Sequence, residues 1–469
     1  MSKTYLDYFK DLCAIPHGSG NTAKIADYCE TFAKQQGLDY IRESCGNMII
    51  FKPGQHGGEA AAPVILQGHL DMVCVKTADC PIDFLRDGLT LEENGDFLSA
   101  KGTSLGGDDG IAVAYALAVL ADKTLRHPPL QVLFTIDEET GMEGALALDP
   151  TPLTARQLIN VDSEEEGTLL AACAGGMRAD LHFVGVHGKA DGAFCAVALR
   201  QLAGGHSGTE IDKGRQNANL LLAQLLKDAG IAQLAAFSGG SADNAIASGA
   251  SAIVAADDAA RQAIRSAFAA KKDTFCPEDR SAVLDIAPVA TDRAFTAADT
   301  KRLLDLLCSV PNGVLSMSDH NPGLVQTSLN LGTVETDGDS VTLGFALRSS
   351  VEQEKTAMLE KLTACAKAHG VSVTTYGAYP AWEYKENSRL RDTFCAVYQA
   401  QYGKPMAVTE IHAGLECGIF SGKMPGLDCV SMGPDIYDIH STDERLSLSS
   451  AKRTFALLCG VLEKLAAQN

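Results

Sequence analysis

The sequence of 469 residues contains no pair of cysteines spaced as C-x-x-C, although it has 14 cysteines. This lack argues against a zinc ribbon and against a thioredoxin-type redox site. The cysteines are also too sparse for a disulfide scaffold. We therefore expect mostly free thiols, buried or inert, in a reducing compartment.

Long apolar runs are also missing. The longest, Ile111 to Ala121, is too short to span a bilayer, which takes about 20 residues, and we expect a buried helix there. The N-terminal stretch from Tyr5 to Lys10 mixes charged and apolar residues as an amphipathic helix does. It lacks the continuous apolar stretch of a signal peptide, so a cytoplasmic protein is expected.

Basic residues are too few to balance the acids. The chain has 39 Lys and Arg against 59 Asp and Glu, and its formal net charge is −20. Such a surface repels nucleic acid and anionic membranes, so neither is an expected partner. Hydrophobic residues at 46% and charged residues at 21% are typical of a globular protein. Because single cores rarely exceed about 250–300 residues, we predict two domains.

Short apolar runs alternate with helical stretches at both ends of the chain. Strands are predicted at 63–66, 130–136, 158–161 and 427–432, helices at 110–121 and 450–466, and a hairpin at Asn94-Gly95. This spacing predicts an α/β fold with a mostly parallel sheet and helices on both faces.

The pattern of residues changes in the middle part of the sequence. Long Ala-rich helical stretches occur at 217–229 and 257–271, with alternating segments such as 340–347 between them. We therefore predict that an inserted α+β domain, residues 177–381, interrupts the α/β domain formed by residues 1–176 and 382–469.

Three of the predicted strands run into histidine or acidic residues. These residues are His69 and Asp71, Asp137-Glu138-Glu139, and Asp162. Ligands bind at the carboxyl ends of the strands in an open α/β sheet, so these side chains are expected at one edge. Asp108-Asp109 precede the helix near Gly110, and His440 lies in the loop after the last strand.

Two histidines and several carboxylates are the ligand chemistry of zinc and similar divalent ions. So many acids would repel one another without a cation. Two metals about 3.5–4 Å apart, bridged by one carboxylate, would relieve this repulsion and generate a hydroxide nucleophile. Glu138 and Glu139 can then divide the work, one binding metal and the other taking a proton from water. Taken singly, the motifs also fit surface pairs, a helix N-cap or a solvated turn.

Several motifs resemble the co-catalytic zinc peptidases that include carnosinases, aminoacylases and desuccinylases. The motifs are QGHLDMV from Gln67, GTSLGGDDG from Gly102, DEETGMEG from Asp137, GGHSG from Gly204 and EIHAGLECG from Glu410. The resemblance covers essentially the whole chain and fits the aminoacyl-histidine dipeptidase branch best. Many relatives have Lys where this chain has Gly110, which leaves the role of Asp109 open, with an N-cap as its expected task.

The resemblance implies a catalytic domain interrupted by a lid or dimerisation domain, a small peptide substrate and a homodimer. It also implies two divalent metal ions, zinc first, with cobalt or manganese possible. The implied roles are His69 and His440 as terminal ligands on separate metals, Asp108 as the bridge beside a cis peptide bond, Glu139 and Asp162 as the remaining ligands, Glu138 as general base and acid, and Asp71 as the residue that orients His69.

In the lid domain, the resemblance implies that His206 supports the oxyanion, often from a partner subunit, although GGHSG alone also fits a glycine-rich turn. Arg348 could clamp a substrate carboxylate in a bidentate fork, with an ordinary ion pair as the alternative. His412, Gly414 and Glu416 are expected to line the substrate pocket, where Glu416 would pair with the peptide amino group.

We therefore predict hydrolysis of the peptide bond in dipeptides, with aminoacyl-histidine substrates favoured by the resemblance alone. A related metal-dependent aminoacylase or deacetylase is one alternative, and a non-catalytic binding protein is another. A serine hydrolase also fits in part, because GTSLG matches G-x-S-x-G and Ser104, Asp162 and His440 follow a triad order. Several residues separate Ser104 from the predicted helix, however, whereas a nucleophile elbow needs a tight turn.

Overall fold

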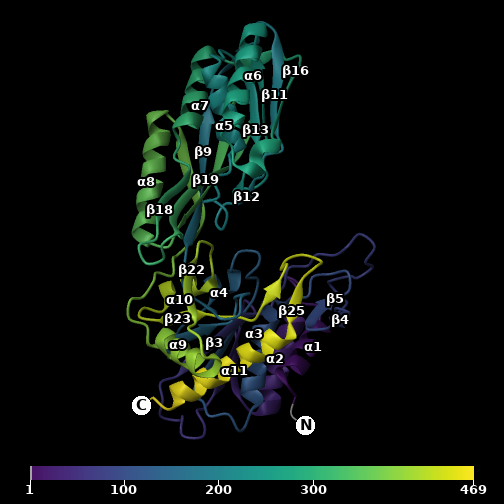
Figure 1. Ribbon diagram of the computed structural model, residues 1–469, viewed down its shortest axis with the longest axis vertical. Helices are drawn as coiled ribbons and strands as arrows, with labels where there is room; N and C mark the ends of the chain where they lie inside the picture. Colours follow the sequence, from purple (N-terminus) through teal and green to yellow (C-terminus); the bar gives the residue numbers. More distant parts are fainter. Residues whose placement is uncertain (1–2, 469) are drawn as a thin grey trace. The chain divides into compact units, whose positions relative to one another are not determined.

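The computed structural model describes residues 3–468, which form two compact units. Unit 1 comprises Met1–Ala172, Tyr384–Glu410 and Leu415–Asn469, and unit 2 comprises Cys173–Glu383 and Ile411–Gly414. Figure 1 shows that the purple N-terminal and yellow C-terminal parts of the chain belong to the same unit. The domain limits expected from the sequence, with 177–381 as the inserted part, stay a prediction.

An eight-stranded sheet forms the centre of unit 1, in the order β1-β2-β6-β3-β7-β23-β8-β22. Its strands are β1 (Asp39–Arg42), β2 (Met48–Lys52), β3 (Val64–His69), β6 (Leu130–Thr135), β7 (Gln157–Asn160), β8 (Thr168–Cys173), β22 (Ala407–Ile411) and β23 (Asp428–Ser431). The four central strands β6, β3, β7 and β23 run parallel. Strands β1, β2 and β8 pair antiparallel. The α/β class is confirmed, but the sheet is mixed rather than mostly parallel.

Helices pack against this sheet in a single apolar core. The helices that contribute to this core are α1 (Tyr5–Cys13), α2 (Ala23–Gln36), α3 (Gly107–Ala121), α9 (Arg389–Tyr402) and α11 (Leu448–Ala466). Helices α4 (Glu143–Ala147) and α10 (Glu416–Lys423) contact each other outside this core. Helix α3 is apolar around its whole circumference and buried along almost its entire length, as expected for a helix covered on all sides. The fully buried Tyr115 hydroxyl donates to the carbonyl oxygen of Ala451 at 2.6 Å, which joins α3 to α11.

A small four-stranded sheet places two distant loops beside each other. Strands β4 (Leu91–Asn94) and β5 (Phe97–Ala100) form the predicted hairpin, in which Gly95 has a left-handed φ of 61°. Strand β25 (Arg445–Ser447) pairs with β5, and β24 (Ile436–Tyr437) pairs with β25. The loop that carries His440 is therefore held near the segment that leads from β5 into α3.

Unit 2 is built on a nine-stranded antiparallel sheet in the order β16-β11-β15-β13-β19-β20-β9-β21, with β18 paired to β19. The strands are β9 (Gly175–Val184), β11 (Phe194–Arg200), β13 (Leu234–Gly239), β15 (Ala250–Ala255), β16 (Val283–Pro288), β18 (Gly313–Met317), β19 (Val325–Asp337), β20 (Ser340–Ser349) and β21 (Ser372–Tyr379). Two short pairs accompany it, β12 (Gly205–His206) with β14 (Ala245–Ile246) and β10 (His187–Lys189) with β17 (Arg293–Phe295).

The helices of unit 2 share one apolar core with its sheet. They are α5 (Ala218–Asp228), α6 (Asp258–Lys272), the short 3₁₀ turn η1 (Pro277–Ser281), α7 (Ala297–Ser309) and α8 (Glu352–Ala368). The predicted α+β character of this part is confirmed. Over residues 3–468 the cysteines are free thiols, and no helix is long and apolar enough to cross a membrane.

The burial of α3 predicts how substitutions in it change the free energy of unfolding. Leu117 is 0% exposed, so Leu117→Ala should lower the free energy of unfolding by about 2–5 kcal/mol through lost burial and a residual cavity. Leu146 in α4 is 47% exposed, and the same substitution there should change it by less than about 0.5 kcal/mol. Urea unfolding followed by far-UV circular dichroism compares the two variants. Equal losses would contradict the central position of α3.

Candidate metal centre

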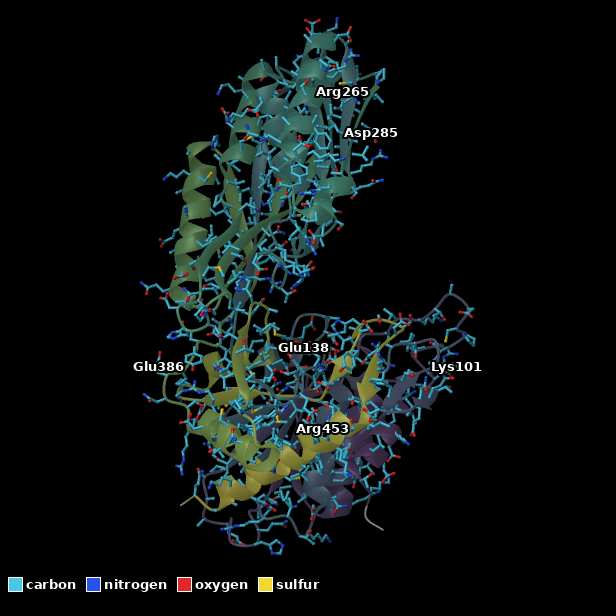
Figure 2. The ribbon with its side chains drawn as sticks, in the orientation of Figure 1. Lys101, Glu138, Arg265, Asp285, Glu386 and Arg453 are labelled. Carbon is cyan, nitrogen blue, oxygen red and sulfur yellow. The ribbon has the colours of Figure 1, made fainter. Side chains whose placement is uncertain are left out.

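The predicted residues of unit 1 come together at the carboxyl ends of its central strands. His69 is the last residue of β3, and Glu138 and Glu139 lie in the turn after β6. Asp162 follows β7 by two residues. Asp108 lies in the first turn of α3, while His440 lies in the loop between β24 and β25. Figure 2 labels Glu138 in this part of unit 1.

Asp108 occupies the middle of this cluster. Its Oδ1 lies 3.1 Å from Nε2 of His69, and its Oδ2 lies 3.1 Å from Nε2 of His440. The His440 nitrogen also lies 3.0 Å from Oε1 of Glu139, and the His69 nitrogen lies 3.6 Å from Oδ1 of Asp162. One carboxylate therefore stands between two imidazoles, each of which has a second carboxylate of its own.

The donor atoms of the cluster suit divalent ions. In each of three overlapping groups, one donor atom from every residue lies within 4.8 Å of the others; the groups are His69–Asp109–Asp162, His69–Glu138–Glu139 and Asp108–Glu139–His440. Imidazole nitrogen and carboxylate oxygen are the donors that zinc and related ions take. The residues present thus fit a pair of cations that share Asp108.

Electrostatics in the cluster also favour a cation. Hydrogen bonds to Asp108 and Glu139 raise the pKa of His440 to about 10. Burial alone would lower the pKa of His69, but its contacts with Asp108, Asp162 and Asp71 raise it well above the usual value. The carboxylates therefore draw positive charge towards both imidazole nitrogens.

The surroundings shift the pKa values of the acids in opposite directions. Burial works to raise the pKa of Asp108, but hydrogen bonds with His440 and His69 hold it below its usual value. Burial raises the pKa of Asp162 to about 6. Burial, with the neighbouring carboxylates of Asp162, Glu416 and Glu139, raises the pKa of Glu138 well above its usual value. A carboxyl group with a raised pKa holds a proton more readily than an exposed one, which suits a group that accepts and returns a proton.

Asp71 supports two parts of the site. Nδ1 of His69 pairs with the backbone oxygen of Asp71 at 2.9 Å, and the carboxylate of Asp71 lies 3.5 Å from the same nitrogen. The carboxylate accepts hydrogen bonds from the backbone N–H groups of Glu138 at 3.0 Å and Glu139 at 3.3 Å, and from the hydroxyl of Ser19 at 2.8 Å. It thus fixes the turn after β6 as well as lying beside the imidazole.

The expected N-cap role of Asp109 is wrong. The N-cap position of α3 is Gly106, and the peptide bond between Asp108 and Asp109 is cis, as the resemblance implied. Asp109 is buried, and its Oδ2 accepts a hydrogen bond from the backbone N–H of His69 at 3.1 Å. A side chain at Gly68 would reach within 2.6 Å of that oxygen, so glycine is needed for this approach.

Three loop residues near the cluster adopt a backbone conformation that is unusual for residues other than glycine. Asp137, Asp438 and His440 have φ values of 53°, 53° and 58°. The carboxylate of Asp137 accepts a hydrogen bond from the backbone N–H of Gly20 at 2.7 Å, which helps to hold its turn. Such strain persists only where the surroundings enforce it, and it concentrates at functional sites. Asp and His adopt this conformation more often than most residues other than glycine, which gives the sequence only a weak signal for it.

A polar layer lies inside the sheet, close to the strand ends. Asn160 donates to the side-chain oxygen of Gln67 at 2.6 Å, and the amide of Gln67 and the hydroxyl of Thr135 both donate to Oε2 of Glu416. Glu416 is fully buried, and burial raises its pKa to about 8. Its expected pairing with a substrate amine stays a prediction, and this burial does not favour it.

Unit 2 contains a separate polar cluster around Arg348, which is only 6% exposed. One guanidinium nitrogen donates to the hydroxyl of Tyr379 at 3.1 Å, and another lies 3.4 Å from Nε2 of His206. Nε has no partner, and no carboxylate pairs with Arg348 among residues 3–468. The ion pair considered as an alternative for Arg348 is therefore not formed within the described chain.

Two histidines beside Arg348 have lowered pKa values, which favours their neutral form. Burial, with the charge of Arg348, lowers the pKa of His412 to about 3 and also lowers the pKa of His206. Nε2 of His412 pairs with the hydroxyl of Ser328 at 2.7 Å, while its Nδ1 has no partner. A side chain at Gly414 would lie within 3.0 Å of the Tyr379 ring, so glycine keeps this segment close to the cluster.

The serine hydrolase alternative is wrong. Ser104 is buried, and its hydroxyl donates to the carbonyl oxygen of Val73 at 2.7 Å and accepts from the N–H of Val75 at 3.3 Å. This hydroxyl therefore serves the local backbone, and Asp162 lies beside His69 rather than beside His440.

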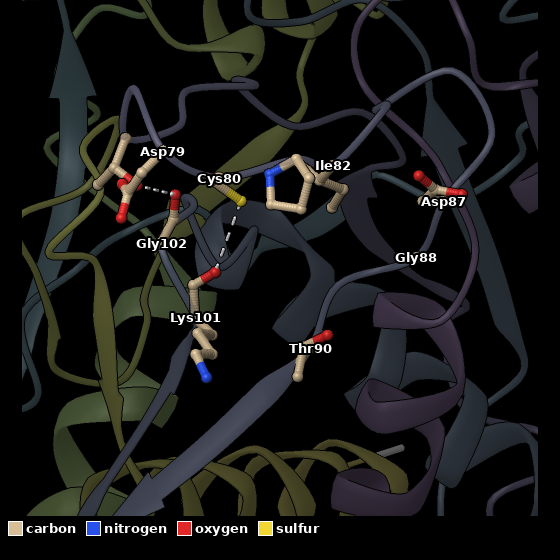
Figure 3. Close-up of a pocket in the computed structure, with 10 residues that line it drawn as sticks. Asp79, Cys80, Ile82, Asp87, Gly88, Thr90, Lys101 and Gly102 are labelled. Atoms are coloured by element: carbon tan, nitrogen blue, oxygen red, sulfur yellow. Dashed lines mark hydrogen bonds between the residues drawn. The ribbon is translucent and has the colours of Figure 1, made fainter.

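A cavity of about 680 Å³ in unit 1 is a different feature (Figure 3). Its wall includes Cys80, Asp87, Lys101 and Gly102, and none of the predicted site residues lines it. It presents no histidine, so the metal-ligand chemistry of unit 1 lies in the cluster around Asp108.

The raised histidine pKa values make a prediction for metal uptake. At pH 7.5, binding of zinc ions to chelator-treated protein should release about two protons, because both imidazoles must lose one before their nitrogens can bind metal. A histidine with a raised pKa stabilises the fold fully below its usual value of 6.5 and loses this contribution as pH passes the folded value of about 10. The melting temperature of the chelated protein should therefore fall between these pH values.

Calorimetric titration in two buffers of different protonation enthalpy counts the released protons. His440→Asn should release about one proton fewer than the wild type. Metal binding without proton release would contradict the charge state inferred for the two rings.

Known proteins resemble this chain in sequence and in fold. The chain is 38% identical to the cytosol non-specific dipeptidase of Escherichia coli (strain K12), over 98% of this chain and 97% of the relative. Its fold superimposes with a TM-score of 0.90 on the crystal structure of aminoacylhistidine dipeptidase from Vibrio alginolyticus, at 36% identity over 98% of this chain and 96% of that one. Aminopeptidase PepT from Bacillus cereus ATCC 10987 shares the fold, with a TM-score of 0.63 and 15% identity over 98% of both chains.

Residues 65–464 match the profile of peptidase family M20/M25/M40. This span contains every residue of the cluster, from His69 to His440. The chain therefore belongs to peptidase family M20/M25/M40 and is, as the sequence predicted, an enzyme that hydrolyses peptide bonds.

Proposed function

We propose that this peptidase is a dipeptidase that works with two divalent metal ions, zinc first among them, and that aminoacyl-histidine dipeptides are its favoured substrates. The observation that carries the proposal is the carboxylate of Asp108, whose two oxygens face the imidazoles of His69 and His440 at 3.1 Å each. The name of the Escherichia coli relative, a non-specific dipeptidase, supports dipeptides as substrates, and the name of the Vibrio alginolyticus relative supports aminoacyl-histidine dipeptides among them.

Five residues would hold the metals. Asp108 would be shared, His69 with Asp162 would complete one site, and His440 with Glu139 would complete the other. When bound, the ions supply Lewis-acid chemistry, since they polarise a peptide carbonyl and lower the pKa of water. Cobalt or manganese would suit the same donors.

Glu138 is the proposed proton carrier. Its backbone N–H is tied to Asp71 at 3.0 Å, which fixes the start of its side chain beside the cluster. Because burial and neighbouring carboxylates raise its pKa, its carboxylate is a stronger base than an exposed one and can take a proton from the attacking water. It then passes this proton to the nitrogen of the leaving amine, so that both products leave in stable form.

Arg348 and His206 are proposed to bind oxygens of the substrate. Nδ1 of His206 accepts a hydrogen bond from the N–H of Thr209 at 3.2 Å, which fits the neutral tautomer with its proton on Nε2. That N–H and a guanidinium N–H group of Arg348 face each other at 3.4 Å, and both are donors. Two such donors suit an oxygen anion, either the terminal carboxylate of a peptide or the oxyanion of the reaction. His412 and Gly414 would complete the lining of this cluster.

We also propose a cytoplasmic location and a homodimer. The Escherichia coli relative is named a cytosol dipeptidase, which supports the location. The homodimer rests on the resemblance to the co-catalytic zinc peptidases.

Hydrolysis of a dipeptide panel that includes β-alanyl-histidine tests the function. Activity should be lost on chelation and restored by zinc, and Glu138→Gln should lower kcat by about 10²–10⁴-fold while zinc still binds, because only the proton carrier is removed. Glu143→Gln is the matched control, since Glu143 is exposed in α4 five residues further on, and its activity should stay at the wild-type level.

Three outcomes would speak against this function. Activity that is indifferent to chelation would exclude the metal mechanism. Activity on N-acyl amino acids without any on dipeptides would assign the aminoacylase alternative. Near-native turnover by Glu138→Gln would remove Glu138 from the proposed role.

The proposed role of Arg348 predicts a dependence on the substrate terminus. Arg348→Lys should raise KM for free dipeptides by about 10–100-fold, because a charge-assisted hydrogen bond contributes about 1.5–3 kcal/mol. Dipeptide amides, which lack the terminal carboxylate, should be affected far less. Arg293→Lys, at an exposed position of unit 2, serves as the control. An equal rise in KM for acids and amides would contradict carboxylate binding by Arg348.

A further inference from the structure

Glu444 is a buried carboxylate outside the set of residues that would hold the metals. It is 2% exposed, and no basic side chain pairs with it within the described part of the chain, residues 3–468. Its Oε2 accepts hydrogen bonds from the backbone N–H groups of Leu105 at 2.7 Å and Gly106 at 3.2 Å, and its Oε1 accepts one from Gly107 at 2.8 Å. These charge-assisted bonds compensate for the cost of burying the carboxylate.

The three donors belong to one tight turn that ends immediately before Asp108. Gly106 has a left-handed φ of 66°, which turns successive N–H groups to the same side and forms a concave anion site. A side chain at Gly106 would meet Sδ of Met72 at 2.8 Å, and one at Gly107 would lie 3.3 Å from Oε1 of Glu444. The backbone of this turn is thus shaped around the Glu444 carboxylate.

Glu444 connects two segments that are far apart in the sequence. It lies four residues after His440, and its partner Leu105 is 339 residues away along the chain. The pairing of β25 with β5 brings these regions near each other, but it involves Arg445–Ser447 and leaves the turn before Asp108 unpaired. The hydrogen bonds of Glu444 bind that turn directly to the loop of His440.

We propose that Glu444 is a positioning residue that holds Asp108 and His440 at the separation at which both reach the same divalent ion. This inference rests on the proposed two-metal function. Oδ2 of Asp108 and Nε2 of His440 lie 3.1 Å apart, so a small shift of the turn changes the donor geometry directly. Groups that orient metal ligands in this way typically contribute 10–100-fold to metal affinity.

Glu444→Gln tests the proposal with little change in size. An amide NH₂ group replaces one carboxylate oxygen and cannot accept a hydrogen bond, so at least one N–H of the turn loses its partner. Asp428→Asn is the matched control. Asp428 is also buried, and it accepts hydrogen bonds from the N–H of Leu390 at 3.0 Å and the hydroxyl of Ser388 at 2.6 Å. It is the first residue of β23, at the opposite end from the cluster.

The measurements are zinc titration of the chelated proteins and thermal unfolding with and without zinc. For Glu444→Gln we expect one of the two zinc ions to bind about 10–100-fold more weakly, with a smaller rise in melting temperature on zinc addition. Asp428→Asn should lower the melting temperature equally in both forms and keep the wild-type zinc affinity. Glu444→Asp keeps the acceptors on a shorter side chain and should recover part of the affinity.

The outcomes separate this inference from the function on which it rests. Wild-type zinc affinity and an unchanged zinc-induced rise in Glu444→Gln, or in Glu444→Asp if the amide variant does not fold, would overturn the positioning role. The same holds if both forms of Glu444→Gln lose stability equally. A wild-type protein that binds no divalent ion would instead overturn the two-metal function.

Discussion

The carboxylate of Asp108 lies between two imidazole rings, and the surrounding residues compensate for the negative charge that it adds to an already acidic cluster. Asp162, Glu138 and Glu139 crowd the same strand ends, where each buried charge raises the cost of the next. Positive charge must therefore be present at this place, whether as protonated imidazole or as metal. The demand for a cation follows from the packing of the sheet, because parallel strands direct their last residues to one edge.

Hydrogen bonds to two further carboxylates fix the positions of the residues in this cluster. Asp71 holds the turn of Glu138 and Glu139, and Asp109 holds the backbone of His69. Both supports are carboxylates that accept hydrogen bonds from backbone N–H groups, so they fix main chain rather than side chains. Side chains positioned through the main chain leave fewer soft torsions between the scaffold and their nitrogen and oxygen atoms.

The parts of the fold and site that were predictable from the sequence are those set by local patterns. Strands β3, β6, β7 and β23, the hairpin at Asn94-Gly95 and helix α3 follow from apolar runs and turn residues. The residues of the cluster were predictable because each follows a strand or opens a helix.

What the sequence did not reveal depends on contacts between distant segments. The hydrogen bond from His69 to Asp109, the anchoring of Glu444 and the antiparallel flanks of the sheet require knowledge of which segments meet. The left-handed conformation of His440 depends on its surroundings, and its residue type alone does not predict it. The lowered pKa values of the histidines beside Arg348 likewise result from burial in unit 2, which no local pattern reports.

The placement of β23 between β7 and β8 has a consequence for how the protein is made. Ser163 and Ser431, whose hydroxyls lie 2.9 Å apart, are separated by 268 residues. At about 5–20 residues per second, a ribosome needs about 13–54 s to cover that interval. During this time the edge of β7 lacks its neighbour, and the nascent chain carries His69 and Asp108 without His440. Almost all of unit 2 leaves the ribosome in the meantime and can form its own sheet first. A growing chain therefore exposes an unfinished strand edge and all the carboxylates of the cluster without His440, until the segment from β23 onwards completes the sheet and the cluster.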